Sequence, residues 1–279
     1  MPVIVVIAPG AMGAAVGARL AEHGVEVWTV LAGRSPASAA RAEAAGMRGV
    51  DARQVGAADI VLSIVPPGEA LALARSLSPA MHEAVRKPVY ADCNAVSPQT
   101  VAAIAAEVDA AGVPFVDAGI IGGPPKPGTP GPLIYASGPH APALGLLAQH
   151  GLRVSDLDGP VGAASGLKMS YAGITKGLTA LASAMMLAAT RFGAAPALAA
   201  ELAASQPDLL KYLARSVPDM YPKAYRWVAE MQEIAAFAGE DGPTRDIYAA
   251  IGAFYDGLAQ DVAGPRQEAG ALDAFLGRS

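Results

Sequence analysis

The sequence predicts an α/β Rossmann domain with a doubly wound, mostly parallel sheet, followed by an all-α domain. Three observations lead to this prediction. Over residues 1–158, apolar β-branched runs alternate with segments whose apolar residues have helical spacing. A glycine-rich turn follows the first run, and no strand-like run appears after residue 191. A long helix over residues 164–191 joins the two parts, so we expect domains at 1–158 and 159–279.

The composition limits the classes of partner and the compartment. Hydrophobic residues make up 53% of the 279 positions, and the formal net charge of −5 argues against nucleic acid or anionic lipid as a partner. A single cysteine, Cys93, excludes an internal disulfide and fits a reducing compartment. The first residues are typical of a strand and not of a signal peptide, and the apolar run 177–190 is shorter than the ~20 residues that a bilayer needs. We therefore expect a cytoplasmic protein that does not bind membranes.

The chain begins with a predicted βαβ unit. Residues 3–7 are a continuous β-branched run, as in a strand buried on both faces. Helical spacing follows over 14–23, and a second strand is predicted over 25–31. The turn between the first strand and the helix therefore lies where a dinucleotide pyrophosphate binds in such units.

The sequence of that turn, Gly10-Ala11-Met12-Gly13, is close to the dinucleotide fingerprint, although Ala8 stands where the first glycine belongs. Gly10 would let the backbone approach a pyrophosphate, and Gly13 would let the helix pack close to the strand. The backbone amides of Ala11 and Met12 would meet the phosphate charge at the helix N-terminus. An ordinary strand–turn–helix corner is the alternative interpretation.

The end of the second strand indicates which dinucleotide is bound. An acidic residue there would bind the ribose 2′-hydroxyl of NAD, whereas an arginine accommodates the 2′-phosphate of NADP. This chain has Arg34 and Ser35 and no acid before Glu43. We expect NADP, with NAD as a possible cofactor; a solvated loop arginine is the alternative interpretation of Arg34.

The remaining segments alternate in the same way and then become helical. The loops after Val65-Pro66, Asn94 and Gly122 follow predicted strands, so they would form the rim of the cofactor and substrate site. The run 177–190 is apolar on nearly every side, which predicts a helix buried all round, with a second subunit covering part of it. The further predicted strands are 58–65, 89–92, 113–117, 133–137 and 151–156, and the helices are 69–77, 98–108, 196–204, 208–216, 222–238 and 244–262.

Several motifs together resemble the β-hydroxyacid dehydrogenase superfamily, which includes 3-hydroxyisobutyrate and 6-phosphogluconate dehydrogenases. They occur in the order of that family and cover about two-thirds of the chain. The C-terminal part resembles the branch with a variant helical domain. The matching features are Gly10 to Gly13, Val65-Pro66, residues 92–98, Asp117-Ala118 leading to Gly122-Gly123, and Gly162 to Lys168.

The resemblance implies a Rossmann domain, a helical domain, an intertwined homodimer and NAD(P)-dependent oxidation of a 3-hydroxy acid or reduction of the matching carbonyl. This chain departs from the pattern of the family at four positions. Ile121 stands in place of a substrate-binding serine, and Tyr171 and Ala172 replace an asparagine pair. Gln232 stands in place of a lysine. We therefore expect a substrate other than 3-hydroxyisobutyrate.

Lys168 is the predicted acid–base residue. A lysine desolvated where two domains meet has its pKa lowered, because burial disfavours the charged form, and can then move a proton near neutral pH. Tyr171 shares its helical face and could hydrogen-bond the substrate. Gly122 and Gly123 could offer backbone amides to an anion, or could simply turn the chain into the loop 124–132. A structural ion-pair partner is the alternative interpretation of Lys168.

These observations predict an NADP-dependent oxidoreductase that transfers hydride between the nicotinamide and a 3-hydroxy or 3-oxo acid derivative. An imine reductase is one alternative, because the site lacks the serine and asparagine. A non-catalytic NADP-binding protein is the other. We expect no metal, because the histidines have no Cys or His at ligand spacing; they are His23, His82, His140 and His150.

Overall fold

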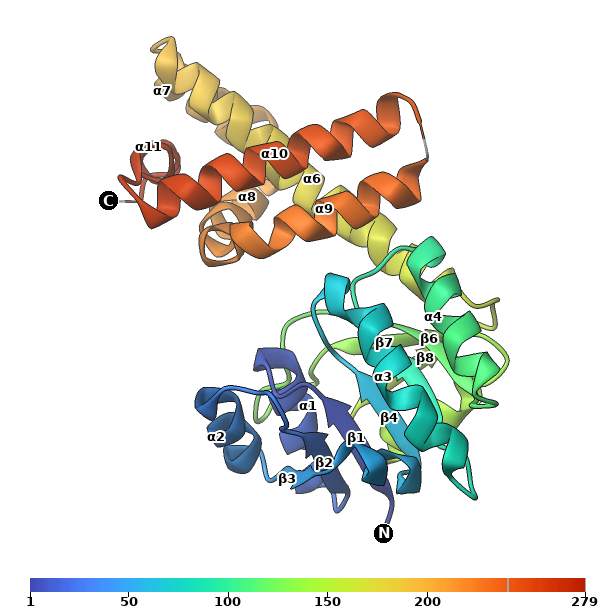
Figure 1. The fold of residues 1–279 in the computed structure, drawn as a ribbon. Helices are drawn as coiled ribbons and strands as arrows, with labels where there is room; N and C mark the ends of the chain where they lie inside the picture. Colours follow the sequence, from blue (N-terminus) through green and yellow to red (C-terminus); the bar gives the residue numbers. More distant parts are fainter. Residues whose placement is uncertain (240, 279) are drawn as a thin grey trace. The chain divides into compact units, whose positions relative to one another are not determined.

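A single eight-stranded sheet, in the order β3-β2-β1-β4-β5-β6-β7-β8, lies at the centre of the N-terminal part of the protein (Figure 1). The structure is a computed structural model that describes residues 1–239 and 241–278. Strand β7 is antiparallel to β6, and the other neighbouring strands are parallel, so the predicted mostly parallel sheet is confirmed. The strands are β1 Val3–Ile7, β2 Glu26–Val30, β3 Arg48–Val50, β4 Ile60–Ser63, β5 Val89–Asp92, β6 Phe115–Ile121, β7 Leu133–Ser137 and β8 Arg153–Asp156.

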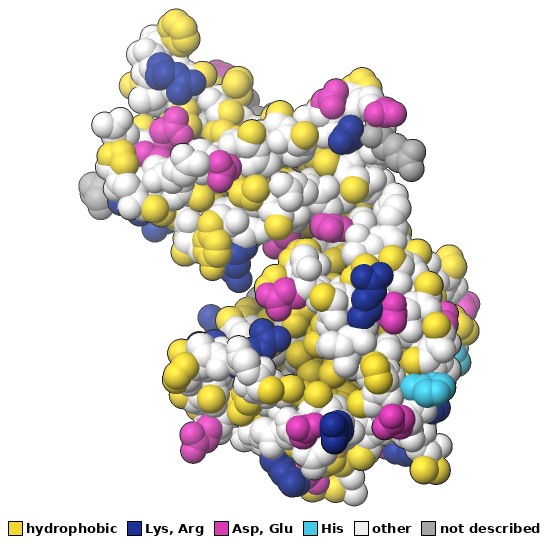
Figure 2. Space-filling model, in the orientation of Figure 1, with side chains coloured by type: hydrophobic (Ala, Val, Ile, Leu, Met, Phe, Trp, Pro, Cys, Tyr) yellow, Lys and Arg dark blue, Asp and Glu magenta, His cyan; other side chains and the backbone are white. Residues whose placement is uncertain are grey.

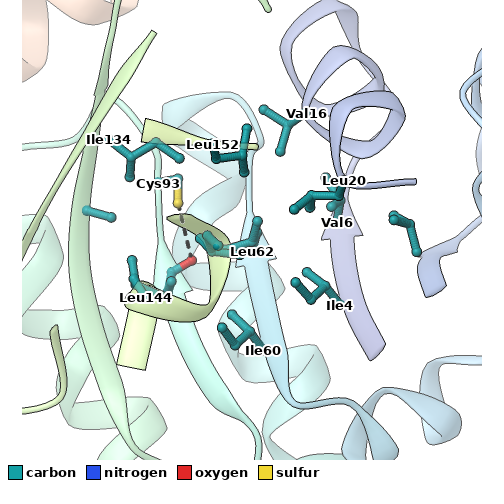
Figure 3. Packing of buried hydrophobic residues seen from close by; sticks show 14 of the residues in the cluster. Ile4, Val6, Val16, Leu20, Ile60, Leu62, Cys93, Ile134, Leu144 and Leu152 are labelled. Carbon is teal, nitrogen blue, oxygen red and sulfur yellow. Dashed lines mark hydrogen bonds between the residues drawn. The ribbon is translucent and has the colours of Figure 1, made fainter. Parts of the chain in front are cut away.

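Helices cover both faces of this sheet, because successive side chains of a strand point to opposite faces. Ile4 and Val6 pack with α1 and α5 on one face, as Figure 3 shows in part, whereas Val5 and Ile7 pack with α3 and α4 on the other. Both faces of β1 are therefore buried, which explains its unbroken β-branched sequence. The helices are α1 Ala11–Glu22, α2 Pro36–Ala44, α3 Ala70–Glu83, α4 Pro98–Ala110 and α5 Gly145–Gln149, and short 3₁₀ turns lie at Ala52–Ala57, Pro67–Glu69 and Ala141–Leu144.

The structure corrects one predicted strand and adds elements that the sequence analysis missed. The strand expected over residues 113–117 runs from Phe115 to Ile121, because its second half pairs antiparallel with β7, as in the pair Ile121 with Leu133. Strand β3 and helix α2 were not anticipated. Helix α2 is preceded by the N-cap Ser35, whose hydroxyl accepts from the Ser38 amide.

The C-terminal part consists of helices joined by short turns, and its described residues include no strand. Helix α6 leads into it, and α9 packs along α10 with the rings of Trp227 and Tyr255 in edge contact at 5.2 Å. The all-α prediction is confirmed, and α11 is an additional helix. The helices are α6 Ala163–Arg191, α7 Ala195–Ser205, α8 Pro207–Met220, α9 Ala224–Ala238, α10 Pro243–Ala263 and α11 Gln267–Phe275, with a 3₁₀ turn at Tyr221–Lys223.

Contacts between residues divide the chain into two compact units, Met1–Lys168 and Met169–Ser279, so helix α6 belongs to both. The domain boundary expected between residues 158 and 159 stays a prediction. On the face drawn in Figure 2, basic and acidic side chains are interspersed over both units.

Within one chain, helix α6 leaves part of its surface exposed, so the expectation that a second subunit completes the burial of residues 177–190 stays a prediction. A stripe of large apolar side chains is exposed along it: Ile174 (68%), Leu178 (39%), Leu181 (57%) and Met185 (62%). By length and composition α6 is the one helix among the described residues that could cross a membrane. Its opposite face makes polar contacts within the protein, such as the hydrogen bond from the Tyr255 hydroxyl to the Lys176 carbonyl (2.6 Å).

Candidate active site

The glycine turn after β1 has the geometry that a dinucleotide requires. A Cβ atom on Gly13 would lie 2.0 Å from the carbonyl oxygen of Ala8, so only glycine lets α1 pack this close to β1. A Cβ on Gly10 would meet nothing within 4 Å, and both Gly10 and Ala11 are exposed. The first amides of α1, including those of Ala11 and Met12, have no acceptor within their own helix. The turn therefore fits a pyrophosphate.

Arg34, Ser35 and Arg41 follow β2, at the position that distinguishes NAD from NADP in Rossmann folds. The Arg34 guanidinium is 3.7 Å from the Glu69 carboxylate, in a partly exposed ion pair that stabilises little. The Ser35 hydroxyl caps α2. Arg41 donates from Nε to the Pro9 carbonyl at 2.9 Å and from Nη2 to the Ser38 hydroxyl at 2.9 Å, and so connects α2 to the glycine turn. The guanidinium groups of Arg34 and Arg41 are therefore available near the predicted position of the 2′-phosphate.

The carboxyl ends of β4 and β5 are joined by a buried network around Asn94. Its side-chain amide donates to the Ser63 hydroxyl and to the Asp92 carboxylate, each at 2.8 Å, and its oxygen accepts from the Val65 amide at 2.6 Å. Burial raises the pKa of Asp92 to about 6. Because the Asn94 side chain is used within the protein, it is the Asn94 backbone carbonyl that faces the site.

Asp117 fixes the start of the helix that carries Lys168. Its carboxylate, fully buried on β6, accepts hydrogen bonds from the Gly162 amide (2.9 Å) and the Ser165 amide (3.1 Å). It also accepts from the hydroxyls of Ser165 (2.6 Å) and Ser137 (3.0 Å). Amides at a helix N-terminus lack helical acceptors, so a buried carboxylate there holds the first turn of α6 to the sheet.

Gly119 lets that helix approach the sheet. A Cβ at this position would lie 2.9 Å from the Ala164 carbonyl oxygen and 3.2 Å from Cβ of Lys168. The side chain of Lys168 is half-buried, and its Nζ donates to the Asn94 carbonyl oxygen at 3.4 Å. The lysine amine is therefore held at the carboxyl end of β5, which is where open α/β sheets bind their ligands.

The other predicted site residues take different positions. In the first unit, Ile121 is half-buried at the end of β6, while Gly122 and Gly123 are exposed, and Gly122 has a φ of +122° that favours glycine. Tyr171 (52% exposed) and Ala172 (8% exposed) belong to the second unit, about one turn along α6 from Lys168. Among the described residues, no group of three or more His, Cys, Asp or Glu side chains could hold a metal ion.

Three positions that shape this site received no role of their own in the sequence analysis. Asp117 appeared there only as part of a family motif, and Arg41 and Gly119 were not singled out. A glycine within a buried apolar strand often marks a close backbone approach, so Gly119 carried a readable signal. Asp117 bonds to residues that lie 20 to 48 positions further along the chain, and Arg41 bonds to Pro9, which lies 32 positions before it. No spacing rule predicts such pairs.

The sheet order, the glycine turn and the lysine at the sheet edge define the class of NAD(P)-binding proteins with a 3-hydroxyacid dehydrogenase-like fold. Within that class, residues 3–146 match the family model described as the NAD binding domain of 6-phosphogluconate dehydrogenase, and the chain belongs to this family. Residues 189–258 match the domain of unknown function DUF1932. The resemblance found in the sequence is thereby confirmed.

Solved structures support the same fold over nearly the whole chain. The conserved protein MTH1747, described as structurally similar to 3-hydroxyacid dehydrogenases, is 29% identical over 94% of this chain and 98% of its own, with a TM-score of 0.71. The Mycobacterium tuberculosis 3-hydroxyisobutyrate dehydrogenase with L-serine is 18% identical (95% and 99% covered, TM-score 0.68). An imine reductase from Myxococcus stipitatus in complex with NADP⁺ is also 18% identical (99% and 100% covered, TM-score 0.55). No curated protein sequence matches the chain.

Proposed function

We propose that this protein is an NADP-dependent oxidoreductase that transfers hydride between the nicotinamide and a 3-hydroxy or 3-oxo acid derivative. The observation that supports this most directly is the position of Lys168. Its amine lies 3.4 Å from the Asn94 carbonyl at the carboxyl edge of the sheet, on a helix fixed by Asp117 and Gly119. An amine held there can give a proton to the substrate oxygen during reduction and take it back during oxidation.

The residues of the first unit fit NADP. The turn from Gly10 to Gly13 would hold the pyrophosphate, and the exposed backbone after Val65 and Pro66 would line the nicotinamide half. Arg34 and Ser35 would bind the 2′-phosphate, because a phosphate dianion competes well with the weak Glu69 ion pair. When bound, the cofactor supplies or accepts the hydride.

One observation supports a second candidate, reduction of a C=N bond. Ile121 leaves the carboxyl end of β6 less polar than a small hydroxy acid requires, and imine reductases share the fold at 18% identity. A cyclic imine with NADPH, compared with 3-oxo acids, distinguishes the two reactions. The absence of turnover with every substrate, together with tight NADP binding, would favour a non-catalytic NADP-binding protein.

The test of the leading proposal is the Lys168→Ala variant. We expect turnover to fall by ~10²–10⁴, the usual contribution of general acid–base catalysis, while NADP affinity stays nearly unchanged. Lys168→Arg should not restore turnover, because guanidinium does not give up its proton near neutral pH. Lys87→Ala, which removes another half-buried lysine of the same unit, is the matched control. Near-normal turnover of Lys168→Ala would contradict the proposal, and the proton donor would then be sought at Tyr171 or Asn94.

We also propose a homodimer in which a second copy covers the apolar stripe of α6. The stripe residues, Ile174, Leu178, Leu181 and Met185, recur at spacings of four, three and four, which is the spacing of a helix face that packs on another helix. A contiguous exposed patch of this kind commonly marks an interface.

A further inference from the structure

Arg41 of helix α2 takes a position that its place in the sequence does not explain. It belongs to the last turn of α2, where a basic side chain ordinarily interacts with the C-terminus of the helix. Its guanidinium lies instead towards the start of α2, because side chains of a helix point towards its N-terminus. Nη2 donates to the Ser38 hydroxyl at 2.9 Å, and Nε donates to the Pro9 carbonyl at 2.9 Å. Arg41 therefore spans from the first turn of α2 to the residue that precedes Gly10.

A continuous chain of polar groups runs through this arginine from the end of β2 to the glycine turn. The Ser35 hydroxyl lies 3.2 Å from the Ser38 hydroxyl, which accepts from Arg41, and Arg41 in turn donates to Pro9. In a Rossmann fold the 2′-phosphate of NADP would bind at the β2 end of this chain and the pyrophosphate at the glycine turn. The Arg41 guanidinium thus lies between the two places where NADP carries phosphate.

Arg41 and Arg34 differ in how their charges are compensated. The Arg34 guanidinium forms an ion pair with the Glu69 carboxylate at 3.7 Å. Within residues 1–239 and 241–278, Arg41 has no carboxylate within ion-pair distance, and its two bonds go to uncharged oxygens. A guanidinium has five N–H groups, so about three remain beyond these two bonds. Arg41 keeps its full charge and most of its donors for an anion, whereas Arg34 shares its charge with Glu69.

The two bonds also hold the Arg41 guanidinium in place before any ligand binds. An arginine side chain that is immobilised only on binding loses conformational entropy, and this loss lowers the affinity. Here Pro9 and Ser38 already restrict the side chain. Arg41 is nevertheless exposed, so a ligand in solution can reach it. A planar guanidinium that is fixed and accessible matches the oxygens of a phosphate group.

We infer that Arg41 binds the 2′-phosphate of NADP together with Arg34, and that the preference for NADP over NAD depends on both arginines. This inference rests on the proposed function for the choice of cofactor. The rule for the end of the second strand considers the residues directly after it and so selects Arg34. Arg41 lies seven positions further along the chain, and only the folded α2 brings it to the same subsite.

A purely structural link between α2 and the glycine turn is the alternative role of Arg41, and the two roles predict different ligand dependence. NAD and NADP share the pyrophosphate, so loss of a structural link alone weakens both by the same factor. Only NADP carries the 2′-phosphate, so loss of a phosphate-binding residue weakens NADP further. The ratio of the NAD Kd to the NADP Kd therefore reports the phosphate contact separately from the structural link.

Calorimetric titrations of oxidised NAD and oxidised NADP into the parent and into Arg41→Met measure this ratio without any substrate. We expect Arg41→Met to lower the ratio by about tenfold or more, as the loss of a hydrogen bond between charged groups produces. Arg41→Lys should lower it less, because a lysine keeps the charge but not the paired donors. When Arg34→Ala and Arg41→Met are combined, the preference for NADP should disappear.

Arg53→Met is the matched control, because it removes another exposed arginine of the same unit that takes part in none of these bonds. Its ratio should equal that of the parent, which excludes an effect of net charge alone. Urea unfolding curves check that the variants are folded under the conditions of the titrations.

The outcomes separate this inference from the proposed function. A ratio that Arg41→Met leaves at the parental value overturns the inference, whether both ligands weaken equally or neither weakens. A parent that binds NAD as tightly as NADP refutes the cofactor assignment itself, and the inference with it. A ratio that falls in Arg41→Met, in a protein that turns over no substrate, supports the phosphate contact and refutes the catalytic part of the proposed function.

Discussion

Replacing Asp117 by asparagine tests whether this carboxylate positions Lys168. The substitution keeps the size and shape of the side chain and removes only its charge and part of its capacity to accept hydrogen bonds. In the folded protein, Oδ2 accepts from Ser137 Oγ and from the Gly162 and Ser165 amides, and Oδ1 accepts from Ser165 Oγ. An asparagine with its oxygen at the Oδ2 position retains the first three bonds as neutral ones, while the Ser165 hydroxyl can rotate to accept from the new amide.

The size of the effect follows from these bonds. Hydrogen bonds to a charged group contribute about 1.5–3 kcal/mol and neutral ones about 0.5–1.5 kcal/mol. Losing the charge from three bonds, with some compensation because the bonds share one acceptor, should lower the free energy of unfolding by about 2 kcal/mol. Small displacements of a catalytic group are costly, so turnover should fall by about tenfold or more.

Urea unfolding followed by circular dichroism measures the stability, and titration with NADP measures cofactor affinity. We expect Asp117→Asn to lower kcat while the NADP Kd stays unchanged, since the hydrogen bonds of Asp117 go to Ser137, Gly162 and Ser165 and not to the glycine turn that would hold the cofactor. Asp109→Asn, at an exposed position of α4, is the control and should change neither quantity. An Asp117→Asn protein with the parental unfolding midpoint and the parental kcat would refute the positioning role.

Three further outcomes are expected. Arg34→Ala should raise the NADP Kd by about tenfold or more and leave NAD nearly unchanged in calorimetric titrations, because only NADP presents a phosphate to this side chain; equal or tighter NAD binding by the parent would contradict the cofactor assignment. Leu181→Glu with Met185→Glu should convert a dimer to a monomer in sedimentation experiments, and a stable parental monomer at micromolar concentration would count against the α6 interface. Burial raises the pKa of Asp92 from 3.8 to about 6 in the folded state, so the folded protein holds this proton more tightly than the unfolded chain does. The stability gained from this proton is complete below the unfolded pKa and is lost as the pH rises through about 6. Lowering the pH from 7 to 5 should therefore gain about 1 kcal/mol of stability that an Asp92→Asn protein does not gain; equal pH dependence of the two proteins in urea unfolding would show that Asp92 does not titrate in this range.

The sequence predicts most of the first unit because its strands are short, buried and bounded by turns. The strands predicted over 3–7, 89–92 and 133–137 have the observed bounds. The strand predicted to end at residue 117 continues instead to Ile121, since Gly119 within it resembles a loop residue and the pairing with β7 is a long-range contact. Local pattern identifies a segment that is able to be a strand, whereas its end depends on the partner strand.

The candidate site was predictable only in part, for a similar reason. Gly10, Gly13, Arg34 and Lys168 stand in motifs whose spacing along the chain reflects their chemistry. The bond from Ser165 to Asp117 joins residues 48 positions apart, and the bond from Arg41 to the Pro9 carbonyl joins residues 32 positions apart. Only the folded chain brings such residues together, so no local pattern predicts these bonds.

The hold of Asp117 on the first turn of α6 restricts how the length of this helix can change. Each residue inserted into a helix rotates everything beyond it by about 100° and advances it by 1.5 Å. One insertion between Ser165, which bonds to Asp117, and Lys168 would thus turn the lysine side chain away from the Asn94 carbonyl. Adaptation to other substrates is then expected through exchange of side chains, while the interval of three residues from Ser165 to Lys168 stays constant. In directed evolution, libraries should therefore vary side chains around the sheet edge and leave the length of this first turn untouched.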